Sequence, residues 1–187
     1  MKFKEGALEF DFVDNYQVLK FDETRFYRER FNGLAGSKGI DFLVEAEDEL
    51  VMIEVKDCKG HESDNRWRLG INNSKKHVAP RGLDVEDRDS FDVEVAKKVA
   101  MSLACIVGAA SFNCTELHDV LKKTIAVPVK IILFLEGEFQ SKSRTKKLIM
   151  KCLVDSINKK LKWLNCKVFV EDMGSYKRKY FAVNRTT

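Results

Sequence analysis

The chain has 187 residues, 44% hydrophobic and 33% charged, with a formal net charge of +4. This composition is typical of one globular domain and excludes an intrinsically disordered chain. The mildly basic balance permits an anionic partner without requiring one. Five cysteines without a Cys-x-x-Cys pair argue against a zinc site or a disulfide framework and favour reduced thiols.

No apolar run approaches the ~20 residues that a membrane span needs. The first residues carry acids where a signal peptide needs an apolar core. We therefore expect a cytoplasmic protein with no membrane association, organised as a single domain over residues 1–187.

The N-terminal part predicts a hairpin and a helix. Residues 7–21 alternate in hydrophobicity around a turn at Asp14-Asn15, which predicts an antiparallel hairpin. Asp22 can cap a helix over about 22–34.

Two predicted strands, 39–46 and 50–57, come next and are joined by a short acidic link. Residues 58–90 are polar and lack a clear period, so we expect a long polar loop. Loops of this length are often functional.

The second half predicts helices that alternate with strands. A strand after Pro128 is almost entirely apolar, which is typical of burial on both faces. With a helix at about 142–164 and a strand at 167–173, it forms a candidate right-handed crossover with parallel strands. The remaining predicted elements are helices at 91–110 and 116–126 and an edge strand at 178–184. The order predicts an α/β domain in three layers, a mixed sheet flanked by helices.

Charged residues interrupt one of the apolar strands. Residues i and i+2 of a strand face the same way, so Glu54 and Lys56 share one face. Burying both unpaired would be costly, and a functional site would explain that cost. Asp41, on the adjacent predicted strand, can converge on the same place. Two carboxylates and a backbone carbonyl suit Mg²⁺ or Mn²⁺, and a neighbouring lysine can hold or deprotonate a water.

Asp41 in Gly39-Ile40-Asp41, followed by Glu54-Val55-Lys56, resembles the motif of the PD-(D/E)xK nuclease superfamily, which includes restriction enzymes and Holliday-junction resolvases. In that motif an acid opens one strand and acid-x-lysine lies on the next. Ile40 stands where proline is usual. Segments 20–43 and 50–57 are also similar to a group of uncharacterised bacterial proteins placed in that superfamily by the same motif.

The resemblance implies a restriction-endonuclease-like αβββαβ core over about 22–135, preceded by the N-terminal hairpin and completed by β-α-β at 128–184. It implies that Asp41, Glu54 and the Val55 backbone carbonyl bind Mg²⁺ or Mn²⁺. It also implies that Lys56 assists the attacking water in phosphodiester hydrolysis.

Two further positions follow from the same resemblance. Many members carry an additional glutamate on the first helix, where this chain offers Glu23 and Glu29. Glu23 falls on the same side of the predicted helix as Tyr27 and Arg30, which favours it as the extra metal ligand. Resolvase-like members often have a polar residue on the helix after the loop, a role open to Lys97 or Lys98.

The segment after Lys56 is basic and contains an aromatic residue. Cations neutralise phosphates and a ring can stack on a base, so this segment is a candidate substrate-binding loop. The alternative is a solvated loop with its tryptophan packed on the core. The candidate nucleic-acid-binding residues are Lys59, Arg66, Trp67, Arg68, Lys75 and Lys76. The lysine-rich helix at 142–164 is a second candidate surface, although a solvated polar face explains it better.

Together these features predict a magnesium-dependent nuclease, a hydrolase for which DNA is favoured over RNA. A homodimer would allow it to cut both strands of a duplex. The alternative is a catalytically inactive nuclease-fold module that binds nucleic acid or protein, in which Glu54 and Lys56 form an ion pair at a strand end. Metal binding at Asp41 and Glu54 distinguishes the two.

Overall fold

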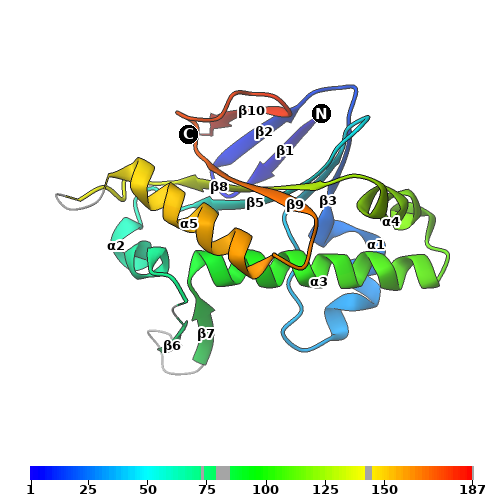
Figure 1. Ribbon diagram of the computed structural model, residues 1–187, viewed down its shortest axis with the longest axis horizontal. Coiled ribbons are helices and arrows are strands. Elements are labelled where there is room, and N and C mark those ends of the chain that lie inside the picture. Colours follow the sequence, from blue (N-terminus) through cyan, green and yellow to red (C-terminus); the bar gives the residue numbers. More distant parts are fainter. Residues whose placement is uncertain (73, 79–84, 142–144, 187) are drawn as a thin grey trace.

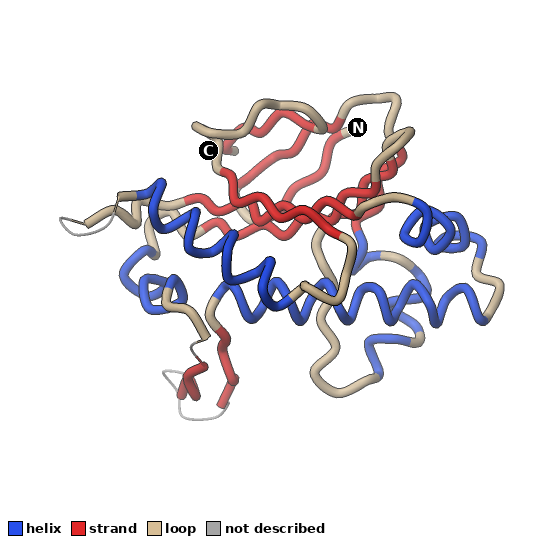
Figure 2. The backbone as a smooth tube through the Cα atoms, in the orientation of Figure 1, coloured by secondary structure: helices blue, strands red, loops and turns tan. Residues whose placement is uncertain are grey.

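A mixed five-stranded sheet forms the centre of the protein (Figure 2). The computed structural model describes residues 1–72, 74–78, 85–141 and 145–186. The sheet has the order β3-β4-β5-β8-β9. Its strands are β3 (Gln17–Lys20), β4 (Phe42–Glu45), β5 (Leu50–Asp57), β8 (Val129–Glu136) and β9 (Cys166–Glu171). The first three pair antiparallel, and β5, β8 and β9 pair in parallel, which confirms the α/β class.

Three helices cover one face of this sheet: α3 (Phe91–Ser111), α4 (Thr115–Ala126) and α5 (Lys146–Lys160) (Figure 1). Their apolar residues share one core with the inward residues of β5, β8 and β9. The predicted parallel pairing of β8 and β9, which α5 connects, is confirmed. Helix α5 begins after Thr145, whose hydroxyl accepts from the Leu148 N–H at 3.3 Å. The predicted helix residues 142–144 lie outside the described part of the chain.

A second sheet, rather than helices, covers the other face (Figure 1). It consists of β1 (Lys2–Glu5), β2 (Leu8–Phe12) and β10 (Phe181–Arg185) in the order β1-β2-β10. The Phe10 ring lies 5.3 Å from Phe42 and 5.5 Å from Phe134, measured between centroids. Each fully buried Phe contributes about 1.5–3 kcal/mol of burial free energy. The three layers are therefore helices, sheet and sheet, which corrects the expected sheet with helices as its flanks.

The N-terminal hairpin lies one strand earlier than predicted. Strand β2 pairs with β1 through a turn at Gly6, which adopts a positive φ of 58° that favours glycine. Strand β3 instead pairs with β4 in the central sheet. Alternating hydrophobicity located both strands, but it carries no information about the partner of each strand.

The predicted helix at 22–34 is broken into three short pieces. A 3₁₀ turn, η1 (Phe21–Glu23), is followed by α1 (Arg25–Glu29) and a second 3₁₀ turn, η2 (Phe31–Gly33). Thr24 has an extended backbone (φ −61°, ψ 144°), which separates η1 from α1.

Segment 58–90, expected to be a long loop, carries regular structure. It contains α2 (Glu62–Asn65), the 3₁₀ turn η3 (Arg66–Leu69) and the antiparallel pair β6 (Ser74–Val78) and β7 (Val85–Asp89). Residues 73 and 79–84 lie outside the described part. Figure 1 shows β6 and β7 projecting away from the central sheet.

Among the described residues, no single helix has the length and apolar composition to cross a membrane. Helices α3 and α4 meet that test only as a pair, and a 120° bend separates them.

Candidate active site

The candidate site lies where β4 and β5 separate, beneath α3. The last residues in register are Phe42 and Ile53. Just beyond them, Asp41 stays attached to β5: its N–H donates to the Ile53 carbonyl at 3.1 Å, and its Oδ2 accepts the Val55 N–H at 2.6 Å. These bonds hold both the backbone and the side chain of Asp41, and its other carboxylate oxygen, Oδ1, accepts from the Lys98 ammonium of α3 at 3.2 Å.

The alternation along β5 directs Glu54 and Lys56 toward the helices. Leu50 and Met52 pack in the core beneath the helices, whereas Val51 and Ile53 pack against the second sheet. Glu54 and Lys56 continue the first set, as the i, i+2 spacing predicts.

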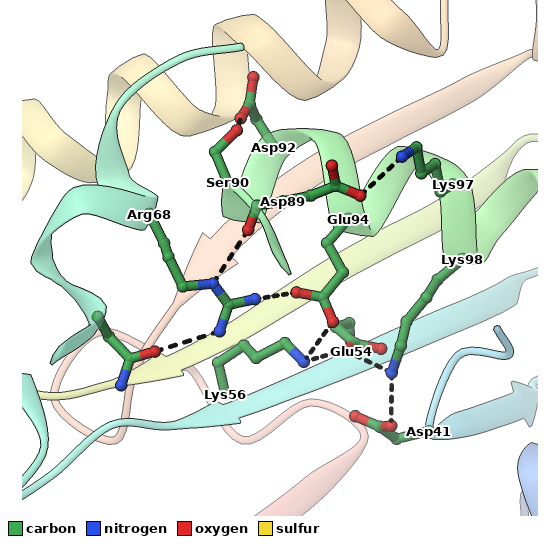
Figure 3. Close-up of polar contacts among 11 residues, drawn as sticks. Asp41, Glu54, Lys56, Arg68, Asp89, Ser90, Asp92, Glu94, Lys97 and Lys98 are labelled. Atoms are coloured by element: carbon green, nitrogen blue, oxygen red, sulfur yellow. Dashed lines mark hydrogen bonds and ion pairs between the residues drawn. The ribbon is translucent and has the colours of Figure 1, made fainter. Parts of the chain in front are cut away.

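Glu54 is the most buried charged group of the site, with 1% of its side chain exposed. Its Oε1 lies 2.8 Å from the Lys56 ammonium and 2.7 Å from that of Lys98 (Figure 3). Both ion pairs involve Oε1, and no described residue donates to Oε2. Oε2 is therefore a buried acceptor without a donor among the described residues, a costly arrangement for a carboxylate.

Burial and like charge act together on Glu54. Desolvation, followed by repulsion from Asp41, raises the pKa of Glu54 to about 7, against the opposing effect of the two lysines. Burial disfavours the charged form of Lys98, but the carboxylates of Glu54 and Asp41 outweigh it and raise the pKa of Lys98. The lysine is therefore a permanent cation in this site.

Glu94, on the first turns of α3, was not predicted and joins the site from above. Its Oε1 accepts from the Lys56 ammonium at 3.0 Å, and its Oε2 is bound by the Arg68 guanidinium (Figure 3). Burial favours the neutral acid, but Lys56 and Arg68 prevail and lower the pKa of Glu94. Glu94 and Lys98 are four residues apart, which places them on one face of a helix. This spacing is the feature of the sequence that could have identified Glu94 as a partner of Lys98 in the site.

We call this group the ion-pair cluster. Its members come from β4–β5, η3 and α3 and are linked by successive ion pairs. They are Asp41, Glu54, Lys56, Arg68, Glu94 and Lys98.

Lys98, rather than Lys97, points into the site. The Lys98 ammonium lies 3.2 Å from Asp41 Oδ1 as well as close to Glu54. Lys97 turns away and pairs with Asp89 at 2.7 Å, with 58% of its side chain exposed.

The first-helix glutamates make other ion pairs. Glu23 lies 3.2 Å from the Lys20 ammonium, and Glu29 pairs with Arg25 at 3.0 Å. Besides Glu54, the Asp41 charge acts on two other acids, Glu5 and Asp22. Burial, with the Asp41 charge adding to it, raises the pKa of both.

The predicted nucleic-acid-binding residues lie partly in and near the ion-pair cluster and partly on β6. Arg68 belongs to the ion-pair cluster, where its guanidinium also lies 4.3 Å from the centroid of the Phe91 ring. Lys59 and Arg66 are exposed and Trp67 is half-buried, all close to Arg68 in sequence. Lys75 and Lys76 lie on β6, paired through the backbone with β7, and their side chains are outside the described part.

A cavity of about 260 Å³ opens beside the cluster. Its lining includes Val55, Lys56, Asn65 and Arg68, from the end of β5 and from the α2–η3 segment. The lining also includes Glu5 and Asp57, so cationic and acidic side chains both border this cavity.

Within the described ranges, no group of three or more His, Cys, Asp or Glu side chains is arranged to hold a metal ion. The site offers two carboxylates, from Asp41 and Glu54, and each lies against a lysine ammonium. Any metal here would need further oxygen ligands from the backbone, water or a substrate phosphate.

The comparisons with known proteins give a family without an assigned activity. A search of curated proteins and a search of solved structures each returned no match. One family model, described as a family of unknown function (DUF6661), matches residues 24–185, which include the whole ion-pair cluster. Because this match spans most of the chain, the protein belongs to the DUF6661 family.

Proposed function

We propose that the protein is a metal-dependent nuclease that hydrolyses phosphodiester bonds, with DNA favoured over RNA. The observation that carries this proposal is the buried Glu54 carboxylate, which has an oxygen without a donor in the described chain and lies beside Asp41 and Lys56. Unsatisfied buried carboxylates are costly, and strongly shifted acids concentrate at functional sites.

The residues present fit a divalent cation. The Glu54 carboxylate, whose Oε2 has no donor among the described residues, and the Asp41 Oδ1 supply hard oxygens of the kind that Mg²⁺ and Mn²⁺ prefer. Asp41, Glu54 and the Val55 carbonyl would hold the ion. Bound there, the metal would supply Lewis-acid activation of a water and a phosphate oxygen.

The chain itself supplies a positioned cation next to that place. Lys56 lines the cavity and is 18% exposed, and Glu54 and Glu94 hold its ammonium at 2.8 and 3.0 Å. From there it can donate to the attacking water or to the scissile phosphate. Glu94 is in turn fixed by Arg68, which makes Glu94 a positioning residue for Lys56.

The resemblance to the PD-(D/E)xK superfamily supports the proposal through the site more than through the element order. An acid before one strand and Glu-x-Lys on the next are both in place on β4 and β5. The order differs from the expected αβββαβ core because β3 precedes α1 and only β4 and β5 lie between α1 and α3 in the central sheet. Glu23 as an additional ligand stays a prediction.

One observation favours the second candidate, a catalytically inactive nuclease-fold module that binds nucleic acid or protein. With Glu54 ionised, the ion-pair cluster contains three carboxylates and three cations, so it is electrically balanced without a metal. A balanced cluster can serve as a structural connection between β5 and α3.

Cleavage of supercoiled plasmid DNA in MgCl₂, with a structured RNA in parallel, tests the proposal. Wild type and the control Lys97→Met should cleave, whereas Glu54→Gln and Lys56→Met should lose at least about 100-fold of the rate, as expected for the loss of one transition-state interaction. Full cleavage by Glu54→Gln would refute the site assignment. Retention of DNA binding without cleavage by any of the four proteins would favour the inactive module.

A further inference from the structure

Lys98 occupies the place between the two candidate metal ligands. Its ammonium lies 3.2 Å from Asp41 Oδ1 and 2.7 Å from Glu54 Oε1, and thus bridges the two carboxylates (Figure 3). A divalent ion shared by the same oxygens would lie about 2.0–2.6 Å from each. The ammonium and such an ion cannot both be there.

Lys98 differs from Lys56 in its partners. Lys56 forms ion pairs with both Glu54 and Glu94, so it retains Glu94 as a partner if Glu54 binds a metal. The ion pairs that the described residues give Lys98 are those with Asp41 and Glu54. Its side chain is 14% exposed and extends from the middle of α3, and its four-carbon stem is flexible enough to swing aside.

The charges of the cluster favour the same conclusion. Asp41, Glu54 and Glu94 balance Lys56, Lys98 and Arg68, so a divalent ion would add two uncompensated positive charges to a largely buried group. Departure of the Lys98 ammonium removes one of these positive charges, and a bound anionic phosphodiester neutralises the other. Like charges in a medium of low dielectric repel strongly.

We infer that Lys98 is a built-in cation that holds the metal position closed, so that the free protein binds Mg²⁺ or Mn²⁺ weakly. The site admits the metal when Lys98 leaves, and the phosphate of a nucleic acid is the anion that favours its departure. The inference rests on the proposed function, since it concerns the access of metal to the same site.

Calorimetric titration of the full chain with MnCl₂, in buffer free of phosphate, tests the inference without any activity measurement. Lys98→Met should bind Mn²⁺ at least about tenfold more tightly than wild type, because it removes the competing charge while keeping the length of the stem. Lys98→Arg retains the charge and should bind as weakly as wild type. Lys97→Met is the matched control, because Lys97 is next to Lys98 in the sequence but pairs with Asp89, outside the cluster.

The double variant Glu54→Gln/Lys98→Met links the gain to the site, because it should lose the tighter binding. Mn²⁺ affinity in Lys98→Met equal to or below that of wild type would overturn the inference. In that case, loss of the wild-type Mn²⁺ binding in Glu54→Gln would still support the metal site and the proposed function. If neither wild type nor Lys98→Met binds Mn²⁺, the inference and the metal-dependent mechanism both fail.

A second measurement needs no methionine variant to fold. In NMR spectra of wild type that resolve lysine side chains, the Lys98 signal is identified by its absence from Lys98→Arg. Saturating MgCl₂ should shift that signal and leave the Lys97 signal in place. A shift of the Glu54 carboxyl signal with an unmoved Lys98 would refute the displacement while upholding metal binding, and no shift of either signal would contradict both.

Discussion

Replacing Glu54 with Gln should stabilise the metal-free protein at neutral and alkaline pH. Burial and the Asp41 charge raise the pKa of Glu54 from 4.5 to about 7. One pKa unit is about 1.4 kcal/mol, so ionised Glu54 destabilises the folded state by about 3 kcal/mol relative to its protonated form. This figure already includes the attraction of Lys56 and Lys98, which lowers the pKa. Gln resembles the protonated acid and avoids the penalty.

The pH dependence has a definite sign. Because the pKa of Glu54 is raised in the folded state, the stabilisation by its proton is complete below about pH 4.5 and is lost as the pH rises through about 7. Glu54→Gln and wild type should therefore have similar free energies of unfolding at pH 4.5. By pH 8, Glu54→Gln should be more stable by about 3 kcal/mol.

Urea denaturation in EDTA, at several pH values, measures this difference. With a slope of about 2 kcal/mol per molar urea, the midpoints at pH 8 should differ by about 1.5 M. Glu29→Gln, at an exposed ion pair, is the control and should follow wild type at every pH. A Glu54→Gln protein that is less stable than wild type at pH 8 would refute the reasoning, because it would mean that the lysines more than offset the burial of the carboxylate.

Three further stability predictions can be checked by the same denaturation experiments. Glu94→Ala should lose about 3 kcal/mol, because it leaves the cations of Lys56 and Arg68 in a buried place without their shared carboxylate; a loss below 1 kcal/mol would contradict this. Asp92→Ala should lose a similar amount, about 3 kcal/mol, since the fully buried Asp92 carboxylate accepts from a hydroxyl and an ammonium of α5. An unchanged midpoint would show that it does not hold α3 to α5. Hydrogen bonds from two lysines and a tyrosine overcome partial burial and lower the pKa of Glu49 to about 2. Glu49→Gln should therefore be less stable than wild type above pH 4.5, and the difference should shrink as the pH falls toward 2; a gap that widens at low pH would be inconsistent with these bonds.

Elements with a strong local signal could be predicted from the sequence. The apolar run of β8 and the helix-strand pattern after it gave the parallel crossover, because burial on both faces leaves a continuous hydrophobic run. The strands around residues 8–12 and 17–20 were also located, but their partners were not. Partner choice depends on which faces bury together, and β2 packs its phenylalanines on the far side of the central sheet.

The candidate site was only partly predictable for the same reason. The shared orientation of the Glu54 and Lys56 side chains could be predicted without tertiary information, because alternate residues of a strand lie on the same face. Glu94 lies in the first turn of α3 and was not predicted as a site residue. Its contact with Lys56 depends on how α3 crosses β5, which no local pattern specifies. Arg68 was predicted as a phosphate contact because its neighbours are basic, whereas tertiary packing directs it to Glu94.

Anomalous diffraction from crystals grown with a short DNA duplex and MnCl₂ tests the central claim most directly. The account predicts a Mn²⁺ peak within about 2.0–2.6 Å of one carboxylate oxygen of Asp41 and one of Glu54, with the Lys98 ammonium displaced from between them. A structure with DNA bound, no peak at that position and Lys98 still bridging the two carboxylates would contradict it.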